Sequence, residues 1–310
     1  MKVVIAGGAG GVGASVAFNL LLGPGDDEVV LLDRRPEMVT SHAMDLQQVL
    51  EQGAIGSIRG GDDEDLPGAD IVVVAASAPL TVNESRMVYL DANARIVAGV
   101  TDRLPAGWDG VLLVVTNPVD PLCTWVQQRS GIERSRVLGY TLNDSLRLRT
   151  GIGRALGLAP GRVEAWMIGE HGNLAVPLFD RVSVDGASVR LSDDQRAEVK
   201  DFIGNWYVRH VGLDSGRSST WTSGLGVARM VSAITHGAPD QVWPASVMLA
   251  GEYGIEGVSL SVPVSLRAGA AGQILEWELT TEQRRGLQNA ADFVREAVQG
   301  LGDLTSADAN

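Results

Sequence analysis

The stretch Gly7-Gly8-Ala9-Gly10-Gly11-Val12-Gly13 directly follows a short apolar run, Lys2–Ala6, at the start of a chain of 310 residues. Three of its glycines, Gly7, Gly10 and Gly13, are spaced three residues apart. At a turn from a strand into a helix, a side chain at either of the first two positions would obstruct the turn or the approach of a pyrophosphate. A side chain at the third would separate the helix from the strand. Such a helix directs its free N–H groups and positive dipole end at the phosphates, so the stretch predicts a dinucleotide-binding unit.

The end of the next apolar run indicates which dinucleotide is bound. That run ends at Asp33, about twenty residues beyond Gly13, where a carboxylate accepts hydrogen bonds from both ribose hydroxyls of NAD. The same carboxylate would repel the 2′-phosphate of NADP, so NAD is the expected cofactor. Arg34 and Arg35 follow directly, and an arginine at this place can hold that phosphate, which keeps NADP as the alternative.

Short β-rich runs alternate with amphipathic stretches of helical length through the first half of the chain. This alternation is typical of a parallel sheet with helices on both faces, so we predict an α/β fold with a Rossmann-type doubly wound parallel sheet. The expected strands are residues 3–6, 28–33, 70–75 and 111–116. The expected helices are residues 11–22, 36–51, 85–103 and 120–129.

The rhythm of the sequence changes after about residue 158, and a C-terminal α+β substrate domain is expected there. The expected strands are residues 163–168, 181–184, 189–191, 245–250, 258–264 and 274–278. The expected helices are residues 192–211, 219–236 and 281–299. We therefore divide the chain into an NAD-binding Rossmann domain, residues 1–141, and a substrate-binding catalytic domain, residues 142–310, with a tight junction between them.

Composition narrows the classes of partner. A formal net charge of −13 disfavours nucleic acid and anionic membranes, because both are polyanions. No apolar run is long enough to cross a bilayer. The single cysteine, Cys123, excludes an intramolecular disulfide and a cysteine-cluster metal site, and no two histidines stand at metal-ligand spacing. We expect a cytoplasmic protein with no nucleic-acid partner, no membrane partner and no metal, and we expect Cys123 to be a small core residue.

The most specific string in the chain is Ile168-Gly169-Glu170-His171-Gly172-Asn173. It resembles the active-site histidine segment of the lactate/malate dehydrogenase family, although Asn173 stands where the family commonly has aspartate. Residues 116–120, Thr-Asn-Pro-Val-Asp, resemble the family's asparagine-proline turn, and residues 143–147 resemble its Leu-Asp-Ser-x-Arg helix. Residues 76–97, with Pro79, Arg86 and Asn93 in register, are similar to its mobile active-site loop and the helix behind it. The resemblance extends from Lys2 to the final helix.

This resemblance implies an NAD-dependent enzyme that interconverts a small L-2-hydroxy acid and its 2-keto acid. Hydride transfer to a ketone leaves charge on oxygen, and His171 is the acid expected to neutralise it. Asp144 would accept from the other ring nitrogen and fix the tautomer. Arg147, one helical turn from Asp144, would hold the substrate carboxylate in a planar fork that lysine cannot provide. Arg86 would polarise the carbonyl once its loop closes over the substrate.

Further residues are assigned by the same resemblance. Asn117 would donate to the carbonyl oxygen or position the nicotinamide, and Ser219 would line the substrate site with slightly more room than the family's threonine. The cofactor-binding set is Gly7, Gly10, Gly13, Asp33, Asn93 and Asn117. A homodimer or homotetramer is also implied, with contacts through helices near residues 38–51 and 219–236.

Leu80 departs from the family pattern. Malate dehydrogenases usually carry an arginine directly after the position of Pro79, and lactate dehydrogenases usually carry glutamine. A second carboxylate left unpaired in a closed cleft costs several kcal/mol, so Leu80 favours a neutral or apolar substituent at C3. Residues 244–246 and 262–264 nevertheless resemble malate dehydrogenases of the lactate-dehydrogenase-like branch. Malate dehydrogenase is thus the alternative, and it would need another cation, such as Arg217.

Two other classes share this architecture. NAD-dependent glycosidases use a metal and a cysteine-histidine pair, and neither their longer chain nor their ligands occur here. A non-catalytic NAD-binding protein is expected to lose the histidine, the aspartate or an arginine of the site, whereas His171, Asp144 and Arg147 are all present. The sequence therefore favours a dehydrogenase.

Overall fold

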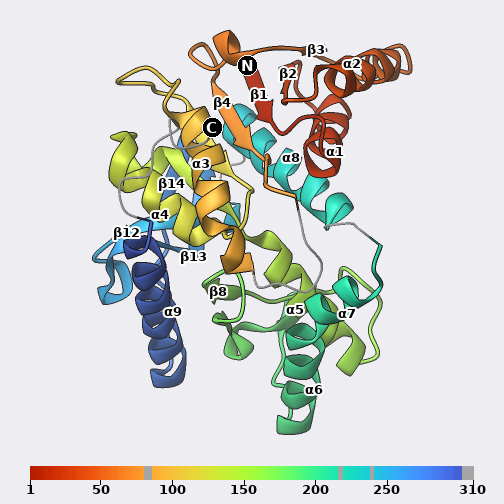
Figure 1. Cartoon of the computed structure of the whole chain (residues 1–310). Helices are drawn as coiled ribbons and strands as arrows, with labels where there is room; N and C mark the ends of the chain where they lie inside the picture. The colour runs from red at the N-terminus through yellow and green to blue at the C-terminus, as the bar shows by residue number, and fades with distance from the viewer. Residues whose placement is uncertain (80–85, 216–218, 238–240, 302–310) are drawn as a thin grey trace.

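Short strands and crossover helices alternate through the first 140 residues of the computed structural model, which describes residues 1–79, 86–215, 219–237 and 241–301 (Figure 1). The strands are β1 (Lys2–Ala6), β2 (Glu28–Leu32), β3 (Ser57–Gly60), β4 (Ile71–Val74), β5 (Val111–Val114) and β6 (Val137–Tyr140). They pair in parallel in the order β3-β2-β1-β4-β5-β6, with Val3 in register with both Val29 and Ile71. The predicted doubly wound sheet is confirmed.

The connecting helices cover both faces of this sheet. They are α1 (Gly11–Leu21), α2 (Pro36–Leu50), α3 (Leu90–Thr101) and α4 (Val119–Ser130), with short 3-10 turns η1 (Asp63–Asp65), η2 (Arg86–Tyr89) and η3 (Arg134–Arg136). The strand order runs one way from β1 to β3 and the other way from β4 to β6. Since such crossovers are right-handed, α1 and α2 lie on one face, and α3 and α4 on the other. The two directions diverge at the carboxyl ends of β1 and β4, where doubly wound folds bind their ligands.

The same sheet continues into the second half of the chain. Strand β12 (Val242–Ala250) pairs antiparallel with β6, with Ala245 opposite Tyr140. The strands beyond it are β13 (Glu256–Arg267), β14 (Ala270–Ile274), β8 (Met167–Gly169) and β9 (Ala175–Pro177). Over the described residues the sheet has eleven strands, and a separate three-stranded sheet contains β7 (Val163–Glu164), β10 (Ser183–Val184) and β11 (Ala187–Ser188). The two predicted domains are therefore joined through one sheet.

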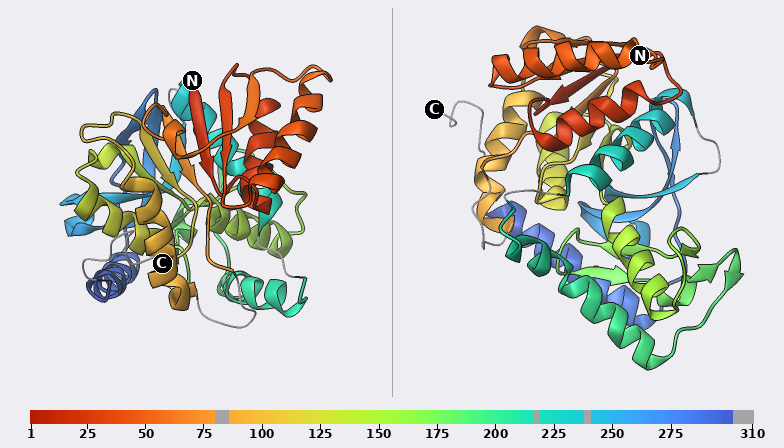
Figure 2. Two further views of the ribbon diagram at one scale, coloured as in Figure 1. Left: turned by 45° about the horizontal axis from the view of Figure 1, so that its top comes forward. Right: turned by 90° about the vertical axis from the view of Figure 1, so that its right-hand side faces the viewer.

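Helices of the second half pack on this sheet or on one another (Figure 2). They are α5 (Leu142–Ala155), α6 (Asp193–Gly204), α7 (Trp206–Gly212), α8 (Thr220–His236) and α9 (Thr281–Gln299), with 3-10 turns η4 (Phe179–Arg181) and η5 (Glu252–Gly254). Helix α8 packs closely along α1: a Cβ added at Gly224 would lie 1.9 Å from the Ser15 hydroxyl. Helix α9 has the predicted bounds because Thr280 and Gln283 form a capping box at its start.

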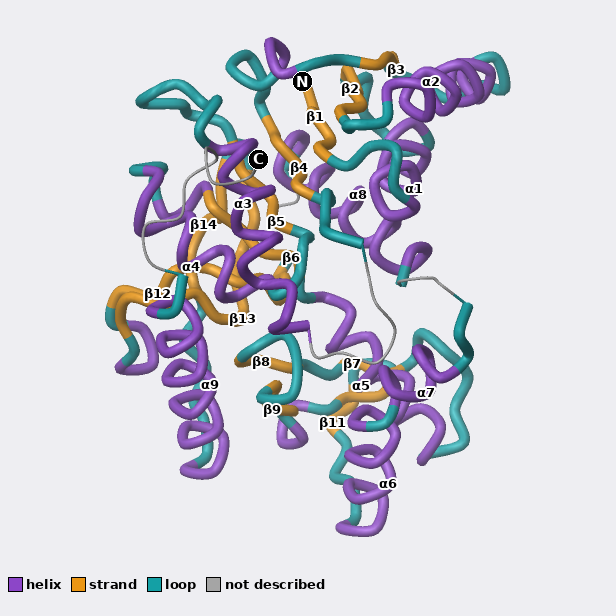
Figure 3. Tube along the Cα trace, viewed as in Figure 1, coloured by secondary structure: helices purple, strands orange, loops and turns teal. Residues whose placement is uncertain are grey.

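One helix expected over residues 192–211 is two helices. The break falls at Asn205, after Gly204, where the Asn205 side chain donates to the Asp201 carbonyl at 3.1 Å and to the Asp201 carboxylate at 2.7 Å. Helix α6 ends at Gly204 beside these bonds, and α7 begins at Trp206 (Figure 3).

Some expected strands differ from those observed. The strand expected at 163–168 is divided between the two sheets: β7 ends at Glu164 in the small sheet, and from Trp166 onward the chain follows the register of β8 with β9, where the Trp166 carbonyl accepts from the amide of Leu178. The strands expected at 189–191 and 274–278 are displaced to β11 and β14. Strands β3 and β6 were not expected: β3 buries only Ile58, and β6 contains Gly139, a residue depleted in strands. Glycine is required there because a Cβ would lie 2.7 Å from Cβ of Ser246.

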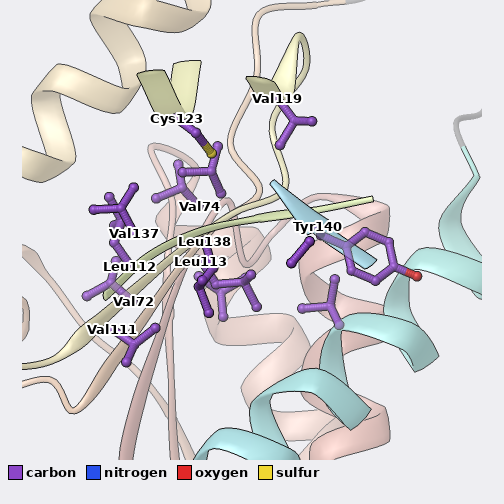
Figure 4. Packing of buried hydrophobic residues seen from close by; sticks show 14 of the residues in the cluster. Val72, Val74, Val111, Leu112, Leu113, Val119, Cys123, Val137, Leu138 and Tyr140 are labelled. Atoms are coloured by element: carbon purple, nitrogen blue, oxygen red, sulfur yellow. The ribbon is translucent and has the colours of Figure 1, made fainter. Parts of the chain in front are cut away.

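Fully buried aliphatic side chains fill the space between the sheet and its helices. Residues of β4, β5 and β6, among them Val72, Leu112 and Leu138, belong to one buried cluster with Val119 and Cys123 of α4 (Figure 4). Cys123 is fully buried, as predicted for a small core residue. Within the described ranges, no helix has both the length and the apolar character needed to cross a membrane.

Candidate active site

The glycine-rich turn joins β1 to α1 with almost no space for side chains. Gly7 has a φ of +92° and donates, together with Gly8, to the Leu32 carbonyl at 2.8 and 3.0 Å. A Cβ at Gly13 would lie 2.3 Å from the Gly7 carbonyl oxygen, so the third glycine allows helix and strand to pack. At Gly10 the nearest protein atom would be 3.2 Å away, which leaves room for a ligand to approach the helix start. All three glycines therefore lie at the turn between β1 and α1, where side chains have little room.

Asp33 lies beside this turn, directly after β2. Its Oδ2 accepts from the amide of Ala9 at 3.3 Å, and its Oδ1 accepts from both the amide and Nε of Arg35 at 3.2 Å. The Asp33 side chain is mostly buried, whereas Arg35 is largely exposed. A cradle without Cβ atoms next to an oriented carboxylate fits the pyrophosphate and ribose of NAD, and the Arg35 guanidinium is occupied by Asp33.

Helix α5 brings the predicted catalytic Asp144 and the predicted substrate-binding Arg147 next to His171. Its residue Asp144 accepts from Nδ1 of His171 through Oδ2 at 2.5 Å. The other oxygen of Asp144 pairs with Nη1 of Arg147, one turn along the helix, at 3.1 Å. His171 itself follows strand β8 and is buried. Because an ionised carboxylate only accepts, Nδ1 carries a proton and Nε2 is the ring nitrogen available to a substrate.

The Arg147 guanidinium also contacts two groups from outside α5. Its Nη2 donates to Oγ of Ser219 at 3.3 Å, at the start of α8. Its Cζ lies 4.1 Å from the centroid of the Trp206 ring on α7. Ser219 is thus brought to the predicted substrate side of the site, and Trp206 is a neighbour that the sequence analysis did not single out.

Asn93 and Asn117 form a bridge beneath the site. The buried side chain of Asn93, on α3, accepts from the amide of Ala78 at 2.7 Å and donates to the Asn117 carbonyl at 2.6 Å. Asn93 therefore joins the segment after β4 to the turn after β5, which includes a cis peptide bond between Asn117 and Pro118. This arrangement gives Asn93 a structural part at the edge of the expected cofactor site.

Three predicted residues fall partly or wholly outside the described structure. Leu80 belongs to residues 80–85 and Arg217 to residues 216–218, and both segments lie outside the described residues. The backbone of Arg86 begins η2, and its side chain is not described. Among the described residues, no three His, Cys, Asp or Glu side chains are grouped in a way that could hold a metal ion.

Two family models together match nearly the whole chain. One, lactate/malate dehydrogenase, NAD binding domain, matches residues 1–139, and the other, lactate/malate dehydrogenase, alpha/beta C-terminal domain, matches residues 141–300. The chain belongs to the lactate/malate dehydrogenase family.

Individual relatives match most of the length of this dehydrogenase. It is 33% identical over 295 residues to the malate dehydrogenase of Halobacterium salinarum, and the match covers 94% of this chain and 96% of the relative. It is 35% identical over 310 residues to L-lactate dehydrogenase 1 of Bifidobacterium longum. This match covers 97% of this chain and 98% of the relative. The solved structure of the malate dehydrogenase from Aeropyrum pernix matches with a TM-score of 0.89 at 29% identity, covering 98% of this chain and 99% of that one. The protein is an NAD-dependent dehydrogenase of this family, and its relatives are named for two different substrates.

Sequence reasoning missed one buried acid of the dehydrogenase site. Asp120, in the first turn of α4, accepts from the amide of His171 at 2.6 Å and from Oγ of Ser246 at 2.6 Å. Burial, followed by the nearby carboxylate of Glu170, raises the pKa of Asp120 to about 8. A carboxyl group in the first turn of a helix reads as an ordinary N-terminal acid, so the only available signal was its place in the matching Asn-Pro-Val-Asp turn.

Proposed function

We propose that this protein is an NAD-dependent L-2-hydroxy acid dehydrogenase whose 2-keto acid substrate carries a neutral or apolar group at C3. His171 is the general acid and base, Asp144 orients it, and Arg147 binds the substrate carboxylate. The observation that carries the proposal is the shared carboxylate of Asp144, which contacts His171 at 2.5 Å and Arg147 at 3.1 Å. A proton donor and a carboxylate receptor are thereby held side by side.

Protonated His171 neutralises the charge that develops on the substrate oxygen. When bound, NADH supplies the hydride that reduces C2 of the keto acid. The Nε2 proton of His171 passes to the C2 oxygen, which leaves a hydroxyl group on the product and a neutral imidazole. Asp144 stabilises the imidazolium before the transfer through the Nδ1 hydrogen bond. In the reverse direction, the neutral imidazole takes the hydroxyl proton.

The remaining assignments come from the matching sequence. Arg147 offers its N–H donors to the carboxylate at C1, with Ser219 next to it at 3.3 Å. Arg86 polarises the C2 carbonyl, and Asn117 contributes a hydrogen bond near the same oxygen. The cofactor contacts are assigned to Gly7, Gly10, Gly13 and Asp33, with Asn93 and Asn117 at the nicotinamide end.

Leu80 supports a substrate other than malate. An uncharged residue at this position provides no partner for a second carboxylate, and Thr81, Val82 and Asn83 add no cation. Malate dehydrogenase is the alternative function, favoured by the malate dehydrogenases among the relatives. In that case Arg217 would have to reach the second carboxylate.

A panel of 2-keto acids, assayed with NADH and with NADPH, tests the proposal. We expect kcat/KM for pyruvate, 2-ketobutyrate or longer apolar acids to exceed kcat/KM for oxaloacetate, with NADH preferred. Preference for oxaloacetate by orders of magnitude would establish malate dehydrogenase instead. Absence of turnover with every acid, despite NADH binding, would support a non-catalytic NAD-binding protein.

Two arginine variants sharpen this test. Leu80→Arg should raise kcat/KM for oxaloacetate relative to pyruvate by roughly tenfold or more, because a charged hydrogen bond contributes about 1.5–3 kcal/mol. Thr81→Arg, which adds the same charge one residue away, is the matched control and should change the ratio much less. Equal shifts in the two variants would mean that position 80 does not face the C3 substituent.

The domain division belongs to the same proposal. Tyr140 ends the last parallel strand, and Leu142 begins the helix that carries Asp144 and Arg147. We assign NAD binding to residues 1–141 and substrate binding to residues 142–310. A cytoplasmic location is proposed from the low cysteine content.

We also propose a homodimer or homotetramer that covers the apolar residues exposed on α1, α2 and α8. These residues are Phe18, Leu22, Met44, Trp221 and Leu225. Light scattering coupled to size exclusion should give two or four times the chain mass of 32.7 kDa. Leu225→Glu should reduce that mass, whereas Val208→Glu on α7 should not. A monomeric wild-type protein would overturn this part of the proposal.

A further inference from the structure

The Trp206 ring forms the floor beneath the guanidinium group of Arg147. Cζ of Arg147 lies 4.1 Å from the centroid of this ring, a distance within cation–π range. His210, one turn further along α7, stacks on the same ring, with centroids 5.1 Å apart and planes 12° apart. Trp206 is only half-buried, so nearby hydrophobic packing does not fully account for its place.

We propose that Trp206 is a positioning residue for substrate binding, which fixes the plane of the Arg147 guanidinium. This inference rests on the proposed function, because it assigns the substrate carboxylate to Arg147. It adds a residue outside the motifs that carry the family resemblance.

Three different contacts orient the Arg147 guanidinium. Asp144 holds Nη1, Ser219 holds Nη2, and the face of the group lies over Trp206. An arginine side chain has many rotamers, and a carboxylate is bound in a bidentate manner only when the plane of the fork is set. The two polar contacts lie at the edges of the guanidinium group, whereas the aromatic ring prevents tilting of the guanidinium plane. Removal of the ring should therefore weaken carboxylate binding even with both polar contacts intact.

Trp206 is the first residue of α7 and directly follows Asn205, whose side chain donates to Asp201 at the end of α6. Helix α6 packs on α5, the helix that carries Arg147, and this packing keeps the start of α7 close to that arginine.

The π face of an aromatic ring carries partial negative charge. It therefore attracts the Arg147 guanidinium, whose Cζ lies over the ring at 4.1 Å from the centroid.

Kinetics of two variants and one control test the inference. Trp206→Leu removes the ring and keeps an apolar side chain; Trp206→Phe keeps a ring. Phe202→Leu on α6 is the matched control, because Phe202 lies 5.0 Å from a different arginine, Arg154. The contact acts equally on bound substrate and transition state, so Trp206→Leu should raise KM for the keto acid by roughly threefold to thirtyfold with kcat little changed. Phe202→Leu should leave KM within about twofold, and Trp206→Phe should fall between. An unchanged KM in Trp206→Leu would overturn the inference.

Tryptophan emission provides a second readout that does not depend on Trp206→Leu folding. Oxamate, a monocarboxylate that is not reduced, should change the emission of the NADH-bound wild-type protein. Trp206→Phe should still bind oxamate, as measured by calorimetry, with most of the emission change lost. Retention of the full emission change in Trp206→Phe would place Trp206 away from the carboxylate and overturn the inference.

Oxamate binding also separates this inference from the proposed function. Wild-type protein that reduces no 2-keto acid would refute the proposed function. A loss of oxamate affinity in Trp206→Leu, but not in Phe202→Leu, would still support the positioning role. Addition of Trp206→Leu to an Arg147→Leu background should then cost little further affinity, because the two side chains act through one contact. Additive losses would contradict that shared contact.

Discussion

The carboxyl group of Asp120 accepts a hydrogen bond of 2.6 Å from the backbone amide of His171, which is 51 residues further along the chain. Its second oxygen accepts at 2.6 Å from Ser246 on β12. One buried side chain on α4 thus joins the residue after β8 to a central strand. The position of the catalytic imidazole depends on this connection as well as on Asp144.

Two substitutions of Asp120 should show how much its hydrogen bonds contribute to the stability of the folded protein. In Asp120→Ala, two buried donors lose their acceptor, so the free energy of unfolding should fall by roughly 2–5 kcal/mol. Asp120→Asn can still accept from the His171 amide and should cost about 1 kcal/mol or less. Urea unfolding at pH 7 measures both. Equal losses in the two variants would indicate that the hydrogen bonds are not what Asp120 contributes.

The raised pKa of Asp120 predicts a pH-dependent stability. The pKa is about 8 in the folded protein against 3.8 for an ordinary aspartate, so the folded state retains a proton that the unfolded state has released. Stability from this group is fully present below pH 3.8, declines as pH rises, and is lost above about pH 8. Wild type should therefore lose stability relative to Asp120→Asn between pH 5 and pH 9, as measured by urea unfolding at several pH values. A constant difference between the two proteins would contradict the shift.

Loss of the imidazole or of its orienting carboxylate should lower turnover. We expect His171→Ala and Asp144→Asn to reduce kcat by about 100-fold to 10,000-fold, the usual range for general acid-base catalysis. NADH binding, followed by its fluorescence, serves as the control and should be nearly unchanged, because neither residue touches the glycine turn. His171→Ala with full turnover would exclude the assigned acid.

Asp33→Ser should shift the cofactor preference. The substitution removes a carboxylate that would accept from the ribose hydroxyls, and it also releases Arg35 from its ion pair of 3.2 Å. We expect kcat/KM with NADH to fall by about 10-fold to 100-fold, the effect of one charged hydrogen bond, while kcat/KM with NADPH rises. Parallel assays with both cofactors measure the ratio. A ratio that stays constant would mean that Asp33 does not face the ribose.

A methyl group at Gly13 should disrupt the nucleotide-binding turn. In Gly13→Ala the new Cβ would lie 2.3 Å from the Gly7 carbonyl oxygen, so the helix must move away from the strand. We expect a loss of about 1–3 kcal/mol in stability and much weaker NADH binding. Gly204→Ala is the matched control, because no atom lies within 4 Å of its added Cβ. Thermal unfolding and NADH titration of both variants provide the comparison.

Local patterns were sufficient for much of the fold and for part of the site. The glycine spacing, the alternation of strands and helices, and the capping box at Thr280 are read from neighbouring residues, so the parallel sheet and α9 could be predicted. Asp144 and Arg147 lie one turn apart on one helix, which made their common helix face predictable, and the structure pairs them there. Their contact with His171 came from family resemblance.

The features that the sequence analysis did not predict depend on contacts between residues far apart in the chain. The pairing of β6 with β12 joins segments about one hundred residues apart, and no local signal marks it. Asp120 looks like a routine helix-start acid until the fold brings His171 and Ser246 to it. Trp206 escaped notice because the helical pattern continues through Asn205, where a side-chain bond to Asp201 ends the helix.

The pairing of β6 with β12 has a consequence for any attempt to divide the chain. If residues 1–141 were produced alone, β6 would present an open edge of unpaired N–H and C=O groups, and β12 would do the same in the other half. Separate fragments should therefore aggregate on their own but complement each other when expressed together. The intact chain should melt in one cooperative transition, without independent melting of its nucleotide-binding portion.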